Sequence, residues 1–479
     1  MKQRPLTPSL SPSDGERVER SATKLFALAF GLFLGLCVWK FGNPVILDHK
    51  ISAPNSFSEF LNEPWPPHWA GWIFLPLAII GAVLISQKQH CSPTNRWLVW
   101  LPLAWLGWQF FSAAKTVDEN LTTATLWEFS GCVAAYFLGK CLFARENLLR
   151  WLLPGLLAVF TFCLVRAVDQ KLFEFPSERQ ALLEGERTGW TNFPPENLIM
   201  MKNDGLILTT NGTDIINPVI LKKLEKGRAY GTLVYPNALA GIILLLWPLS
   251  LALVFGATKN MKRTIRFAAI ALTVFLGGAA FFATDSKLGW LVGIFVAGLF
   301  LLRLDWSKKL KLAAVAAVLI FGLGMFAVRF HSYFSAGATS VGARFDYWRA
   351  AVQTAAAHPL TGTGPGTFQR PYAQLKAPDS EMARLTHNDF LEQFSDSGLP
   401  GGLTYAAWIL LALSVAGKKL WRSADIFSFA IFAGVLAWFV QGLGEFGLFI
   451  PALAWTAFML LGVLLGERRI EFDNKSKTH

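Results

Sequence analysis

Charged residues are scarce in this 479-residue sequence. Asp, Glu, Lys and Arg make up 16% of it, against about 25% in typical soluble domains, whereas 53% of the residues are apolar and 14% are aromatic. The apolar residues come in blocks of about 16 to 25, long enough for a helix to cross a hydrocarbon core about 30 Å thick. This composition excludes a chain of several soluble domains and predicts an all-α polytopic membrane protein.

Motifs that hold metal ions are also missing. The sequence has seven histidines but no CxxC, HExxH or Asp-x-Asp pattern, which argues against a zinc site and against metal-bound nucleotide-sugar chemistry. We therefore expect no metal and no cofactor. The net charge of +12 does not indicate nucleic acid as a partner, because the cytoplasmic loops of a membrane protein account for such a surplus.

Twelve apolar segments are long enough to span a lipid bilayer. They lie near residues 25–42, 69–86, 97–114, 122–139, 149–166, 231–255, 265–283, 288–302, 310–328, 401–417, 424–441 and 447–466. The loops between them alternate in charge: one set carries most of the Lys and Arg, whereas the short loops of the other set hold only Lys50, Lys115 and Lys287. The positive-inside rule then predicts that both termini are cytoplasmic.

Two connections are much longer than the others, and both fall on the external side. Connections of this length in a compact membrane protein usually carry function. The predicted division is a disordered cytoplasmic N-terminus at 1–24, helices one to five at 25–166, an external loop at 167–230, helices six to nine at 231–328, a second external loop at 329–400 that holds the chemistry, helices ten to twelve at 401–466, and a cytoplasmic tail at 467–479.

Several cations lie on the external side, which should be poor in them. Lys222, Lys223 and Lys226 fit a solvated cluster as well as a site, but Arg228 and Lys287 lie at the ends of spans. There they predict an anion site at the membrane surface, because guanidinium groups pair with phosphate oxygens and lysine adds point charge. Asn237, in the first turns of span six, either faces this site or bonds to a neighbouring helix.

The second external loop begins with a segment, 341–357, that has apolar residues at helical spacing. It predicts a helix lying on the membrane surface, with Arg344 outside its apolar stripe. The Gly- and Pro-rich run HPLTGTGPGTF at 358–368 follows and predicts a compact turn whose backbone N–H groups could meet an anion.

Residues 386–394 read as the start of a helix, with Thr386 as its cap and Asp389 in its first turn. On that helix His387 would share one face with Phe390 and Leu391. A single histidine is more often structural than catalytic. Imidazole is nevertheless the side chain best suited to accept a proton from a hydroxyl near neutral pH.

Four segments carry a resemblance to a known family: RAYGTLVYPN at 228–237, SKLGW at 286–290, HPLTGTGPGTF at 358–368, and THNDFLE at 386–392 with SGLPG at 397–401. Together they resemble the superfamily of bacterial O-antigen ligases, O-antigen polymerases and protein O-oligosaccharyltransferases, most of all the ligases. The resemblance covers roughly residues 228–402. It implies a metal-independent glycosyltransferase of the bacterial inner membrane, with the external loops in the periplasm. Such an enzyme takes a glycan from a polyprenyl (undecaprenyl) pyrophosphate donor and joins it to a glycolipid or glycan acceptor.

The resemblance also implies roles for individual residues. Arg228 matches the cation that binds the donor pyrophosphate, and His387 matches the histidine that activates or positions the acceptor hydroxyl. Lys287 stands where the family commonly has arginine, which keeps the charge but loses the bidentate fork. Arg344 and Glu392 are weaker candidates, for contacts with donor and acceptor respectively.

Ligase and polymerase use the same donor and differ in the acceptor, a sugar of the lipid A core or another lipid-linked glycan. The twelve-span plan with a histidine-bearing loop after span nine favours a ligase. A transporter of lipid-linked glycan is the alternative from another class, but long loops after spans five and nine do not fit the paired half-repeats of many transporters.

Overall fold

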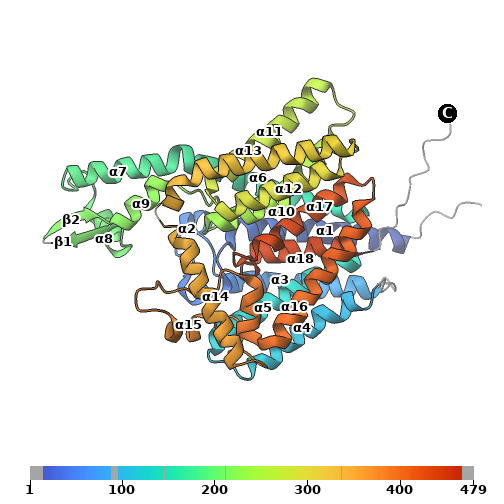
Figure 1. Cartoon of the computed structure of the whole chain (residues 1–479), viewed down its shortest axis with the longest axis horizontal. Helices are drawn as coiled ribbons and strands as arrows, with labels where there is room; N and C mark the ends of the chain where they lie inside the picture. Colours follow the sequence, from blue (N-terminus) through green and yellow to red (C-terminus); the bar gives the residue numbers. More distant parts are fainter. Residues whose placement is uncertain (1–13, 88–94, 145, 211, 336, 467–479) are drawn as a thin grey trace, which may run out of the picture.

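The computed structural model of the chain describes residues 14–87, 95–144, 146–210, 212–335 and 337–466. Within these ranges the fold is helical apart from one antiparallel pair of four-residue strands. Most of the helices run side by side along the long axis of the molecule (Figure 1). The prediction of an all-α polytopic membrane protein is confirmed.

Each of the twelve predicted spans coincides with a helix. These helices are α1 (Asp14–Lys40), α3 (Pro67–Gln87), α4 (Trp97–Ala113), α5 (Glu119–Leu138), α6 (Glu146–Asp169), α10 (Pro236–Ala257), α11 (Arg263–Thr284), α12 (Lys287–Arg303), α13 (Lys308–Ser335), α16 (Asp389–Trp421), α17 (Ile426–Gln441) and α18 (Pro451–Leu465). Among the described residues, seven helical stretches are long and apolar enough to cross a membrane, and they lie in α1, α3, α6 with its extension, α10, α11, α13 and α16. The total of twelve spans and their orientation stay predictions.

Burial separates a central helix from peripheral ones. Every residue of α18 is buried, and this helix packs against α1, α5 and α17. On α11 and α13, by contrast, large apolar side chains such as Phe267, Phe275 and Phe321 are exposed. Such surface is costly in water, so we expect these two helices to face lipid.

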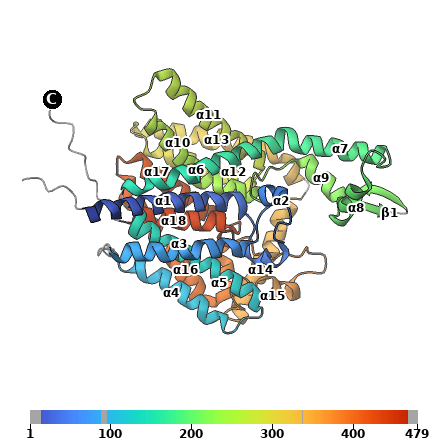
Figure 2. The ribbon, with the colours of Figure 1, turned by 180° about the vertical axis from the view of Figure 1, so that it is seen from behind.

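The first predicted external loop is mostly helical and projects from the bundle. α6 continues through a π-helical turn, Gln170–Glu174, into α7 (Phe175–Arg187). Then come α8 (Pro195–Asn203), β1 (Ile207–Thr210), β2 (Thr213–Ile216) and α9 (Pro218–Lys226). The projection has its own apolar cluster, which includes Leu182 and Trp190. It lies at the end of the molecule opposite the start of α1 (Figures 1 and 2).

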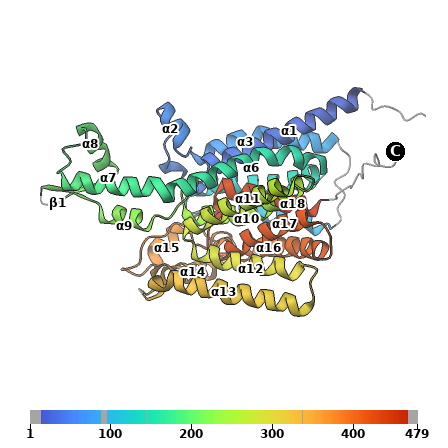
Figure 3. The same cartoon turned by 90° about the horizontal axis from the view of Figure 1, so that it is seen from above.

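The second predicted external loop also contains helices, at the same end of the bundle as that projection (Figure 3). α14 (Thr339–Ala357) and α15 (Gln369–Leu375) follow α13, and α16 crosses the predicted loop boundary at residue 400 with a kink at Gly398. Gly398 has φ +69°, and a Cβ there would lie 2.2 Å from the Leu360 carbonyl oxygen. The helix therefore kinks where the preceding turn packs directly against it.

α1 begins at Asp14, so residues 14–24 are helical where the sequence predicts disorder. The segment is rich in Glu and Arg, which favour helices, and extending an existing helix is easier than nucleating one. Residues 1–13 and 467–479, the rest of the predicted cytoplasmic ends, lie outside the described residues.

Candidate functional site

His387 lies just before α16 rather than on it. Its φ is +53°, in the left-handed region, and the helix starts two residues later. The N-cap is Asn388, whose side-chain oxygen accepts hydrogen bonds from the backbone N–H groups of Phe390 and Leu391 at 3.1 and 3.0 Å. The predicted cap, Thr386, and the predicted helical face through His387 are therefore wrong, because the chain turns at His387 before the helix begins.

Glu392 and Thr386 fix this turn. The Glu392 carboxylate is fully buried and lies 2.9 Å from both the backbone nitrogen and the hydroxyl of Thr386. A non-glycine residue in a rare backbone conformation costs about 1–3 kcal/mol and persists only where its surroundings enforce it. The sequence predicts Glu392 as a contact with the acceptor. The structure places it behind the turn, where it helps to position His387.

Asp389 ties the same turn to the segment between α17 and α18. Its backbone N–H donates to the Gly442 carbonyl oxygen at 2.8 Å, and its carboxylate accepts from the Leu448 N–H at 3.2 Å. A Cβ on Gly442 would lie 2.8 Å from that carboxylate, so the two segments approach as closely as glycine permits. The segment held in this way carries Glu445.

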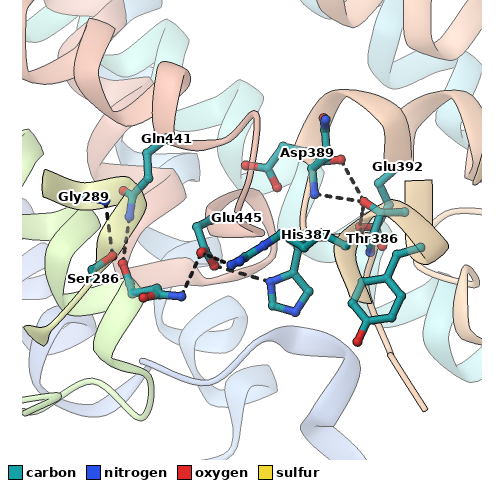
Figure 4. A network of polar contacts seen from close by, with 12 residues as sticks. Ser286, Gly289, Thr386, His387, Asp389, Glu392, Gln441 and Glu445 are labelled. Atoms are coloured by element: carbon teal, nitrogen blue, oxygen red, sulfur yellow. Dashed lines mark hydrogen bonds and ion pairs between the residues drawn. The ribbon is translucent and has the colours of Figure 1, made fainter. Parts of the chain in front are cut away.

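Glu445 is the centre of a polar network. Its side chain is only 7% exposed and accepts hydrogen bonds from the Arg344 guanidinium at 2.5 Å and the Asn237 amide at 2.7 Å. The other carboxylate oxygen lies 3.4 Å from Nδ1 of His387. Asn237 in turn accepts a hydrogen bond from Arg228 at 2.8 Å. The network therefore joins His387 to two of the external cations; Figure 4 shows Glu445 beside the imidazole.

The charge state of Glu445 decides which tautomer His387 adopts. Burial raises the pKa of Glu445, but the hydrogen bond and charge of His387, the charge of Arg344 and the hydrogen bond from Asn237 outweigh it and hold the pKa below its ordinary value. An ionised carboxylate only accepts hydrogen bonds, so Nδ1 of His387 is the donor. Nε2 of the neutral ring then keeps its lone pair, as a general base requires.

Two aromatic rings hold the imidazole in place. Tyr347 stacks on it with ring centroids 5.9 Å apart, and Phe446 meets it edge to face at 4.7 Å. The His387 side chain stays 29% exposed, so one side of the ring is open. Behind Glu445 there is a cavity of only about 10 Å³, room for about one water. Any ligand larger than a water molecule has to approach from the open side.

The predicted cations surround the network. Arg228 is mostly buried, and its Nε donates to the Thr284 carbonyl oxygen at 3.0 Å. Lys287 lies within electrostatic reach of Arg228 and Arg344, and its amine sits 3.9 Å from the ring centre of Tyr333. Nε of Arg344 is buried and has no hydrogen-bond partner among the described residues. Asp285 also lies near Arg228 and Lys287, but it is paired with Arg329 at 2.9 Å. Arg228, Lys287 and Arg344 therefore still outnumber Glu445, and the site as a whole attracts anions.

The glycine-rich turn at 358–368 packs inside the protein instead of facing an anion. The Gly364 N–H donates to the Asp396 carbonyl oxygen at 2.8 Å, and the Gly366 N–H donates to the Asp396 carboxylate at 2.7 Å. Gly362, Gly364 and Gly366 all have positive φ, and a Cβ on any of them would meet a neighbouring atom within 2.4 Å. The anion-binding interpretation of this turn is wrong, because these donors are already used.

Glu445 is not among the residues predicted from the sequence. Its signal is faint: one acidic residue in the short turn GLGEFGLFIP at 442–451, between two apolar segments. Of the predicted residues, the structure brings together His387, Arg228, Arg344 and Asn237 by contact and Lys287 by proximity. No group of three or more His, Cys, Asp or Glu side chains that could hold a metal is found in the described ranges, and the predicted absence of a metal stays a prediction.

Comparison with known proteins tests the resemblance to the O-antigen ligase superfamily. No curated protein matches the chain. The family model described as O-antigen ligase matches residues 272–406. The matched part includes Lys287, Arg344, His387 and the glycine-rich turn. The segment at 228–237, with Arg228 and Asn237, lies outside the match. The predicted resemblance is confirmed over residues 272–406, where this membrane protein carries a domain of the O-antigen ligase superfamily.

Proposed function

We propose that this chain is a glycosyltransferase of the O-antigen ligase type in the bacterial inner membrane. It moves a glycan from a polyprenyl pyrophosphate donor to a hydroxyl of a glycolipid acceptor, such as a lipid A core sugar, on the periplasmic face. The observation that carries the proposal is the shared network: one carboxylate, Glu445, lies against the His387 imidazole and also accepts hydrogen bonds from Arg344 and from Asn237, which binds Arg228.

The cations suit the donor. A pyrophosphate diester carries about two negative charges, and Arg228, Lys287 and Arg344 less the charge of Glu445 leave two positive ones. The exposed part of Arg344 and the amine of Lys287 provide donors for phosphate oxygens, while Asn237 orients Arg228. Fixed cations also stabilise charge that develops on a leaving phosphate, which is usually a large part of catalysis.

The chemistry needs one proton transfer and one displacement. The acceptor oxygen forms a bond to the anomeric carbon of the donor glycan, and the bond from that carbon to the pyrophosphate oxygen breaks. The acceptor proton passes to Nε2 of His387, and the electron pair leaves on the polyprenyl pyrophosphate beside the cations. The buried Glu445 stabilises the imidazolium that forms, as a carboxylate does in hydrolytic triads.

Product analysis tests this function. Purified full-length protein is given a polyprenyl pyrophosphate glycan with and without a lipid A core acceptor, and the products are resolved by mass spectrometry. We expect glycosylated acceptor and free polyprenyl pyrophosphate. Longer lipid-linked glycan in the absence of acceptor would make the chain a polymerase. Movement of intact donor across proteoliposome membranes with no new glycosidic bond would make it a transporter.

A further inference from the structure

An open groove of about 550 Å³ lies at the other end of the bundle, far from His387, where residues of α12, α16 and α17 line it. It lies at the end where α1 begins, opposite the projection formed by α7 to α9 (Figures 1 and 3). The volume falls within the range of ligand sites, about 300–1,000 Å³. None of its lining residues takes part in the network around Glu445.

The groove is apolar along its length and basic at one end. Leu299, Phe432 and Leu436 form the apolar walls. Lys418 and Arg422 line the basic end, and both are exposed. Within the described part of the chain, neither of these two cations is paired with a carboxylate. A groove with this division of polarity matches a molecule with an anionic head and a hydrocarbon tail.

A glycine and a tryptophan also line the groove. A Cβ on Gly417 would lie 3.1 Å from the Phe432 ring, so a larger side chain at this position would press on Phe432 and take up space in the groove. Trp421 lines the basic end and is 42% exposed. An indole ring beside lysine and arginine at the end of an apolar helix is typical of the headgroup level of a membrane.

The acidic residue nearest to the groove in sequence is already engaged. Asp425 caps α17 by accepting a hydrogen bond from the Ser428 N–H at 2.9 Å and another from the Ser428 hydroxyl. Arg303 at the end of α12 stacks on Phe429, 4.1 Å from its ring centre, and adds positive charge nearby. The local field at the basic end is therefore positive.

We propose that this groove binds an anionic phospholipid, with the phosphate at Lys418 and Arg422 and an acyl chain along Leu299, Phe432 and Leu436. Basic pockets between membrane helices on the cytoplasmic side are known to take anionic headgroups. With the predicted orientation, the lipid belongs to the cytoplasmic leaflet. This site does not depend on the proposed transfer reaction, so either can fail without the other.

Lipid retention by the purified full-length protein tests the site. Native mass spectrometry with phosphatidylglycerol or phosphatidylcholine gives the affinity for each lipid. We expect the double variant Lys418→Gln, Arg422→Gln to bind phosphatidylglycerol about 25-fold more weakly, since each cation near an anionic lipid is worth about fivefold. The control Lys308→Gln, Lys309→Gln removes equal charge from exposed positions at the start of α13 and should bind as wild type does.

A fluorescence measurement locates the lipid independently. Brominated phosphatidylglycerol should quench Trp421, a signal read as the difference between wild type and Trp421→Phe, and Gly417→Leu should reduce that quenching by filling the groove. Equal loss of affinity in the lysine control, equal binding of phosphatidylcholine, or the same response to soluble glycerol phosphate would each overturn the proposal. The last result would mean an anion site that needs no acyl chain.

Discussion

Replacing Glu445 by glutamine should stop base catalysis while keeping the shape of the site. The carboxylate uses one oxygen for Arg344 and Asn237 and the other for His387. Glutamine has one oxygen and one NH₂ group. The oxygen is expected to stay with Arg344 and Asn237, which can only donate there, so the NH₂ group turns toward His387.

That exchange changes the histidine. An NH₂ group donates, so Nδ1 of His387 would have to accept, and the ring proton would move to Nε2. The nitrogen that faces the acceptor hydroxyl then has no lone pair for its proton. We expect turnover to fall by about 10²–10⁴, the usual worth of a positioned base, with a much smaller effect on donor affinity.

The assay is single-turnover transfer from prebound donor, with donor affinity measured separately. Glu381→Gln is the matched control: this exposed carboxylate accepts a hydrogen bond from the Tyr347 hydroxyl, and within the described ranges it makes no hydrogen bond or ion pair with His387. Its turnover should be close to wild type. A Glu445→Gln protein that transfers glycan at the wild-type rate would refute the tautomer argument.

The lowered pKa of Glu445 predicts that the stability of the protein depends on pH. Its pKa is lowered in the folded protein, so its contribution to stability is fully present above the ordinary glutamate range and is lost as the pH falls through the lowered value. Wild type should therefore lose thermal stability on acidification more steeply than Glu445→Gln. Parallel curves for the two proteins would contradict this.

Three further predictions follow from the cations, the topology and the kink. Arg228→Ala should weaken donor binding strongly. Lys287→Arg should leave donor binding unchanged or improve it, because a bidentate guanidinium replaces a point charge. Unchanged donor affinity in Arg228→Ala would exclude a role of Arg228 in pyrophosphate binding. In a background without native cysteines, Asp379→Cys should react with an impermeant thiol reagent added outside intact cells, whereas Ser307→Cys should react only after lysis. The reverse pattern would show that the chain has the opposite orientation in the membrane. Gly398→Ala should lower the free energy of unfolding by at least about 1–3 kcal/mol, since the clash of its Cβ with the Leu360 carbonyl oxygen adds to the backbone strain. An unchanged melting temperature would argue against the kink as described.

Hydropathy predicted the helices well because each apolar segment has to form its backbone hydrogen bonds within itself in lipid. It could not predict what happens outside the membrane. α7 and the strands β1 and β2 depend on a small tertiary cluster around Trp190, and the start of α1 at Asp14 depends on extension of an existing helix.

Part of the candidate site could be predicted from the sequence. Arg228 and Lys287 are noticeable because cations at the external ends of membrane spans are unusual, and His387 is noticeable because of the motif at 386–392. Glu445 is not, since it is 58 residues from His387 and reaches it only because Asp389 binds the turn between α17 and α18. The glycines of the 358–368 turn illustrate the opposite error, because residues typical of a binding loop pack inside the protein and hold the site in place. The acceptor contact of Glu392 stays a prediction.

The most direct test of the account is the rate of one turnover of prebound donor in His387→Ala, compared with His68→Ala. His68 also pairs with a carboxylate, Asp48 at 2.8 Å, but lies elsewhere in the fold, at the start of α3. General-base catalysis by His387 predicts a rate about 10²–10⁴ lower in His387→Ala, with donor affinity nearly unchanged, and a wild-type rate in His68→Ala. A wild-type rate in His387→Ala would contradict it.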